Sequence, residues 1–166
     1  MDEGRFWQLI EESKAERDPV KSDQPEVLQA KLERLSPDEI RSFKELFLRL
    51  WYAAYREDLW GAAYIIEGGC SEDGFMDFRS GLIGLGRDAY YQALGNPETL
   101  AEQPTRGVDF SQEGLLYAAD GAYEAVTGEE MPDCPEVSTS ERPEFRWDEE
   151  SVYARFPRLA AQFRRH

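Results

Sequence analysis

The segment from Gly68 to Arg79 holds a dense group of side chains capable of chemistry, directly after an apolar stretch. It contains a thiol, a hydroxyl, three carboxylates and an arginine. A carboxylate can act as a general acid or base when burial raises its pKa, and the apolar flank supplies burial. An arginine fork suits recognition of a carboxylate or a phosphate. The composition therefore predicts a site here, but no residue in the segment dictates a reaction.

Two carboxylates of this segment are predicted to share one helical face. Asp73 and Asp77 are four residues apart, and a helix capped by Ser71 places both opposite Phe75. Two interpretations stay open. In the first, the negative charges stabilise the N-terminus of the helix, which explains Asp73 better than Asp77. In the second, the two carboxylates bind a cation or a donor-rich ligand. Arg79 is interpreted first as the ion-pair partner of an acid in this segment, and second as an anion-binding fork.

Other side chains near the segment allow two interpretations as well. Cys70 precedes a predicted helix N-terminus, which stabilises a thiolate, but it has no basic neighbour, so we interpret it as an inert thiol. Trp60 fits the core by its spacing, with the floor of an aromatic pocket as the alternative. Tyr117, on an acidic helix, faces either solvent or this segment. The candidate ligand-binding residues are Trp60, Glu67, Cys70, Ser71, Asp73, Asp77 and Arg79.

The missing residue types exclude several mechanisms. His166 is the only histidine, so no internal imidazole can activate a serine or cysteine nucleophile. The His/Cys clusters of zinc sites and the Glu-x-x-His pairs of di-iron bundles do not occur. The chain also contains no GxxxxGK[ST] phosphate loop. We therefore expect no metal site and no cofactor, and the catalytic residues, if any exist, stay unknown.

The net charge of −15 is distributed unevenly along the chain. Residues 61–150 carry 20 acidic and 5 basic side chains, whereas residues 151–166 carry four arginines and no acid. This balance opposes direct nucleic-acid binding, which depends on neutralising phosphates. It favours a basic partner, or solubility alone. No apolar run is long enough to span a bilayer and the N-terminus lacks a signal-peptide core, so we expect a cytoplasmic protein without membrane contact.

Helical periodicity must position these residues, and it predicts a single compact all-α domain with many helices. Ser36, Pro37 and Glu39 form the signature of a capped helix N-terminus, which predicts a central core helix. A buried helix over residues 58–66 is expected to end at Gly68. Further helices are expected near residues 6–10, 27–35, 75–94 and 111–126.

The chain is expected to divide into three segments. Residues 1–130 form a helical domain, residues 131–147 an irregular proline-rich connection, and residues 148–166 a basic C-terminal helical segment. Pro157 should split that last segment into two short helices.

Several short motifs resemble the bacterial domain-of-unknown-function family numbered 4240, over about residues 4–130. They include Leu35-Ser-Pro-Asp-Glu-Ile40, Gly69-Cys70-Ser71 and Asp77-Phe78-Arg79. Glu72 stands where many members have Asp. Some members resemble the N-terminal part of a molybdate metabolism regulator, and this resemblance implies regulation or recognition of another macromolecule.

These observations lead to two hypotheses about function. The first is a non-enzymatic acidic binding or regulatory module that engages a basic protein or peptide, with its own C-terminal arginines, Arg158, Arg164 and Arg165, as an internal alternative. The second is an enzyme or small-ligand-binding protein with a carboxylate/arginine pocket around residues 67–79, a peptide being one conceivable substrate. The oligomeric state and the pathway stay open.

Overall fold

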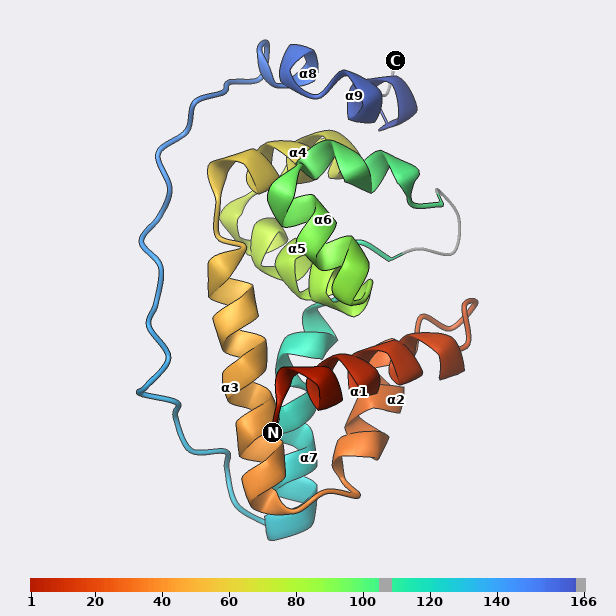
Figure 1. The fold of residues 1–166 in the computed structure, drawn as a ribbon, viewed down its shortest axis with the longest axis vertical. Helices are drawn as coiled ribbons and strands as arrows, with labels where there is room; N and C mark the ends of the chain where they lie inside the picture. The colour runs from red at the N-terminus through yellow and green to blue at the C-terminus, as the bar shows by residue number, and fades with distance from the viewer. Residues whose placement is uncertain (105–108, 164–166) are drawn as a thin grey trace.

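The computed structural model describes residues 1–104 and 109–163, and within them every regular element is a helix (Figure 1). This confirms the all-α class. The elements are α1 (Glu3–Glu16), α2 (Gln24–Leu32), α3 (Pro37–Ala53), α4 (Glu57–Glu67), α5 (Glu72–Gly84), α6 (Arg87–Gly95), the 3₁₀ helix η1 (Pro97–Glu102), α7 (Glu113–Thr127), α8 (Val152–Arg155) and α9 (Pro157–Phe163). None of these helices is long and apolar enough to cross a membrane.

The long helix α3 forms one side of the core, with α7 beside it (Figure 1). It begins with the predicted capping box: the backbone N–H of Glu39 donates to Ser36 Oγ at 3.2 Å, and Glu39 Oε1 accepts from the Ser36 N–H at 3.4 Å. Lys44 reaches from α3 to α7, where its Nζ donates to Asp120 Oδ2 at 2.6 Å and to the Leu116 carbonyl. The side chains that α3 buries in the core include Ile40, Phe43, Phe47 and Trp51.

Helices α4 and α5 position the segment that the sequence singled out. As predicted, α4 ends at Gly68, whose φ of 71° is left-handed, and the Ser71 hydroxyl caps α5 by accepting from the Gly74 N–H at 3.1 Å. A Cβ added at Gly81 would lie 2.2 Å from the Phe110 carbonyl oxygen. The glycines in α5 therefore allow the close contact with the segment before α7.

Residues 129–151, here called the strap, form no helix and run along the outside of α3 toward α4 (Figure 1). Ser140 Oγ donates to the Tyr52 carbonyl at 2.9 Å, and Trp147 Nε1 donates to the Glu57 carbonyl at 2.7 Å. The strap includes residues 131–147, for which an irregular connection is predicted. The strap is nevertheless attached to the C-terminal end of α3 and the N-terminal end of α4.

The C-terminal helices α8 and α9, divided at Pro157 as predicted, pack on α4. Apolar contacts make this interface, through the buried side chains Val152, Phe156 and Leu159. Ion pairs lie at its edge: Arg155 binds Glu57 at 2.6 Å, and Arg158 lies 3.5 Å from Glu102. Helices α8 and α9, here called the tail, thus dock on the helices before the strap, here called the body, through apolar side chains more than through charge. Arg164 and Arg165 lie outside the described residues.

Candidate functional site

The structure divides the predicted site residues among four surroundings. One group lines an open hollow between the α4–α5 junction and the strap, here called the aromatic hollow. A second group lines a hollow between α5 and α7, here called the acidic hollow. Two further residues line neither hollow. The aromatic hollow is lined by Trp60, Cys70 and Ser71, and the acidic hollow by Asp73 and Asp77. The two residues that line neither hollow, each in its own surroundings, are Glu67 and Arg79.

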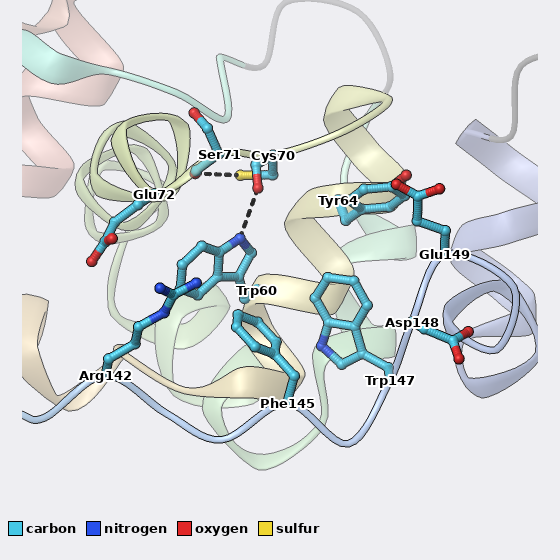
Figure 2. A pocket seen from close by; sticks show the side chains of 10 residues that line it. All are labelled: Trp60, Tyr64, Cys70, Ser71, Glu72, Arg142, Phe145, Trp147, Asp148 and Glu149. Atoms are coloured by element: carbon cyan, nitrogen blue, oxygen red, sulfur yellow. Dashed lines mark hydrogen bonds between the residues drawn. The ribbon is translucent and has the colours of Figure 1, made fainter.

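The aromatic hollow has a volume of about 410 Å³ and is built from two distant parts of the chain (Figure 2). Its walls combine ring faces with three carboxylates and one arginine. The body contributes Trp60, Tyr64, Cys70, Ser71 and Glu72, and the strap contributes Arg142, Phe145, Trp147, Asp148 and Glu149.

Trp60 forms the fixed floor of this hollow. Its indole Nε1 donates to the Cys70 carbonyl at 2.9 Å, and its ring stacks on Phe75 with centroids 4.8 Å apart. Phe145 of the strap meets it edge-on, also at 4.8 Å. Trp60 is only 3% exposed, so it belongs to the core and also lines the pocket. The two interpretations of Trp60 therefore both apply.

The aromatic hollow already holds a cationic group. The guanidinium carbon of Arg142 lies 5.5 Å from the ring centroid of Trp60 and 5.5 Å from that of Phe145. Figure 2 shows the Arg142 side chain extending from the strap across the Trp60 indole. Ring faces attract cations at this distance. The arrangement is therefore suited to a guanidinium.

Cys70 does not supply a nucleophile to the hollow. Burial, with smaller contributions from the nearby charges of Glu67 and Asp77, raises the pKa of its thiol to about 12. The thiol is therefore protonated near neutral pH. This agrees with the interpretation of Cys70 as inert.

The acidic hollow brings together carboxylates from two helices. Asp73 and Asp77 of α5 share a face, as predicted, and Glu113 of α7 lies with them in a hollow of about 400 Å³. Burial raises the pKa of Asp77, and the charges of Glu113 and Asp73 add to this effect. Tyr117, 51% exposed, also lines the hollow and so faces the predicted segment. Among the described residues, no three His, Cys, Asp or Glu side chains are grouped to hold a metal ion.

Arg79 lies in the core, and the predicted ion pair with an acid of its segment is wrong. Its guanidinium lies 3.9 Å from the Trp51 ring centroid and 4.3 Å from that of Tyr55, and Nη1 donates to the Trp51 carbonyl at 3.0 Å. That carbonyl belongs to the last turn of α3, where carbonyls lack helical partners and the dipole is negative. Burial lowers the pKa of Arg79 to about 10, so the group is charged at neutral pH.

Glu67 also has a structural partner. It lies at the end of α4, where its Oε1 accepts from Ser111 Oγ at 2.9 Å. This bond ties α4 to the segment before α7. The predicted carboxylate/arginine pocket is therefore not assembled as one unit, because Glu67, Asp77 and Arg79 point to three different surroundings.

Most of the residues that form these surroundings lie in a part of the chain that matches a known family. The model of the family described as a protein of unknown function, DUF4240, matches residues 1–125. The chain belongs to the DUF4240 family. No curated protein and no solved structure matches the chain at a significant level. The acidic hollow and the rings around Arg79 lie within the DUF4240 match, whereas half of the aromatic hollow lies beyond it.

The residues that sequence reasoning missed include Tyr64, Glu72 and Glu113 on the helices and, beyond the DUF4240 match, those of the strap. Arg142, Phe145 and Trp147 fall in a segment that was interpreted only as an irregular connection. A signal was present, because large aromatic residues are unusual in a proline-rich polar linker. Aromatic side chains in such a segment indicate that it packs on a body.

Proposed function

We propose that this protein is a non-enzymatic binding or regulatory module that engages a basic segment of another protein or peptide at the aromatic hollow. The observation that carries the proposal is Arg142, whose guanidinium rests on Trp60 and Phe145 in the position that a partner's cation would take. A site that accommodates one guanidinium in this chain has the geometry to accommodate another.

The charges around the hollow support the same proposal. Glu72, Asp148 and Glu149 line the hollow together with the rings. Backbone and side-chain hydrogen bonds from Ser151 lower the pKa of Asp148, so its carboxylate is charged at neutral pH. Ring faces and carboxylates together are the usual surroundings of a bound cation. The overall charge of −15 also attracts a basic partner from a distance.

The catalytic alternative has less support. A carboxylate/arginine pocket needs its arginine free to meet a substrate, and Arg79 is 3% exposed and hydrogen-bonded to α3. The Cys70 thiol is protonated near neutral pH because burial raises its pKa to about 12. Binding therefore explains the arrangement of these residues better than catalysis does.

The test is calorimetric titration of the full chain with a nine-residue peptide of alternating arginine and glycine, against a glutamate version. We expect the arginine peptide to bind and the glutamate peptide not to bind. Phe145→Ala should weaken binding roughly threefold to thirtyfold, because one of the two ring faces is lost. Phe145 is 39% exposed, so the fold should tolerate this change.

The matched control is Tyr117→Ala, which removes an exposed ring from the acidic hollow instead. It should leave the affinity within twofold of the unchanged protein. Equal binding of both peptides contradicts the proposal. So does an affinity that falls in Tyr117→Ala and not in Phe145→Ala, because the basic segment would then bind between α5 and α7.

A further inference from the structure

We infer that Arg142 is an internal competitor for this site: it holds the place of a partner's arginine in the free protein, and the partner displaces it. The inference rests on the proposed function and deepens it in two ways. It names the ligand as an arginine side chain in a basic segment, and it makes the strap a regulator of access.

The contacts of Arg142 suit an occupant that can leave. Its side chain is exposed, and among the described residues no acidic side chain forms a salt bridge with it. The two rings at 5.5 Å hold its guanidinium. Exposed contacts of this kind are weak, and displacing one reduces a ligand's affinity by roughly twofold to fivefold. A partner that makes more contacts can therefore replace Arg142.

The strap can release Arg142 while staying attached to the body. Ser140 binds the Tyr52 carbonyl before it, and Trp147 binds the Glu57 carbonyl after it. Between these two attachments, most residues of the strap are exposed. Movement of Arg142 therefore leaves Trp147, and the wall of the hollow that it forms, in place.

The shape of the site favours arginine over lysine. Trp60 and Phe145 meet at an interplanar angle of 70°, so a planar guanidinium can contact the face of each ring. A guanidinium is less strongly hydrated than an ammonium, so it loses less on entering such a site. Glu72 and Glu149 line the same hollow, and a carboxylate can bind a guanidinium through two parallel hydrogen bonds. A lysine cannot reproduce that pairing.

The experiment compares the full chain with Arg142→Ala and Arg142→Lys, each titrated with the arginine–glycine peptide and with its lysine counterpart. We expect Arg142→Ala to bind the arginine peptide about threefold more tightly, because the competitor is gone. Arg142→Lys should fall between the two. The lysine peptide should bind more weakly than the arginine peptide to all three proteins. The double variant Arg142→Ala/Phe145→Ala should not show this gain in affinity, because Arg142 and the arginine of the peptide both contact the Phe145 ring.

The control for charge is Arg146→Ala. It removes the same charge from the strap, but Arg146 lines a different hollow, beside Glu57 and Arg155. Its affinity should match that of the unchanged protein. If Arg142→Ala binds no more tightly than the unchanged protein, or no more tightly than Arg146→Ala, the inference is overturned while the proposed function stands. If none of these proteins binds the arginine peptide, the proposed function fails and the inference fails with it.

Discussion

Two arginines of this protein lie against aromatic rings, and they differ in nearly every other respect. Arg79 is 3% exposed, lies 3.9 Å from the Trp51 ring and donates hydrogen bonds to two carbonyls. Arg142 is exposed, lies 5.5 Å from the rings of Trp60 and Phe145, and comes from a segment without helices. The stacked rings of Tyr55 and Trp60, 6.1 Å apart, connect the two clusters.

The comparison shows that ring contact alone does not define the role of an arginine. Arg79 satisfies the Trp51 carbonyl at the end of α3, which would otherwise be buried without a partner, so removing Arg79 costs more than the ring contact is worth. Arg142 satisfies no buried group, and a cation from elsewhere can make the same contact. The first arginine holds α3 against α5, and the second marks the place where we propose that a ligand binds.

The largest expected effect comes from Arg79→Ala. This change leaves the Trp51 carbonyl without its partner and opens a cavity among three rings, so it should lower the free energy of unfolding by about 3–5 kcal/mol. Arg142→Ala should change it by less than about 0.5 kcal/mol. Urea denaturation of both variants makes the measurement. Equal losses would erase the distinction between the two arginines.

The tail packs on α4, and deleting residues 152–166 should be the next largest change. We expect a loss of about 2 kcal/mol, because Val152, Phe156 and Leu159 are buried and the ordering entropy offsets part of that gain. Thermal unfolding measures it. An unchanged melting temperature would mean that the tail adds nothing to the fold.

Gly61→Val sharpens the same prediction on the intact chain. A Cβ at Gly61 would lie 3.0 Å from the Phe156 ring and 3.1 Å from Trp147 Nε1, so the larger side chain should push the tail away. Gly61→Val should lower the free energy of unfolding of the full chain. In the chain that lacks residues 152–166, the same substitution should cause no further loss. A similar loss in both chains would place the strain within the body instead.

The ion pair at the edge of the tail should make its docking depend on pH. Hydrogen bonds from Arg155 lower the pKa of Glu57, so the stability that this pair contributes is present above the ordinary glutamate pKa. It is lost as the pH falls through the lowered value. Glu57→Gln should cost about 1 kcal/mol at pH 7 and less at pH 3. Hydrogen exchange of α8 and α9 in Glu57→Gln and in the unchanged protein, at both pH values, makes the measurement. A difference in protection that is the same at pH 7 and at pH 3 would contradict the prediction.

The smallest expected effect lies in the acidic hollow. Burial raises the pKa of Asp77, so its charge costs stability at neutral pH, and the cost disappears once the pH falls below the ordinary aspartate value. Asp77→Asn should therefore raise the free energy of unfolding by a few tenths of a kcal/mol at pH 7 and by nothing at pH 3. Asp73→Asn, on the exposed rim, is the control. Destabilisation by Asp77→Asn at pH 7 would show that its charge is used.

Local signals predicted where α3 and α5 begin, because the groups that cap a helix are close in sequence. They did not predict that the apolar pattern over residues 75–94 is divided between α5 and α6. Ser36 with Glu39, and Ser71 with Gly74, satisfy backbone groups within one turn. The partner of Arg79 could not be predicted this way. It is the Trp51 carbonyl, which reaches Arg79 only through the packing of α3 against α5.

The aromatic hollow was harder still to predict. Its floor, Trp60, was named from the sequence, but its second ring, Phe145, comes from a segment whose path depends on where Ser140 and Trp147 attach. An irregular segment has no periodicity from which its path can be derived. The predicted candidates lie in different hollows because α5 turns its residues in different directions. Ser71, which precedes the first turn of α5, lines the aromatic hollow, whereas Asp73 and Asp77 face α7 from within the helix.

The most direct test follows the indole N–H signals by NMR while the arginine–glycine peptide is added to labelled full-length protein. Trp60 lies under Arg142 and Trp51 lies over Arg79, so the two indoles report on the two clusters separately. We predict that the Trp60 signal shifts as the peptide binds and that the Trp51 signal does not. A Trp60 signal that stays unchanged while the backbone amide of Tyr117 in the acidic hollow shifts would contradict the assignment of the binding site.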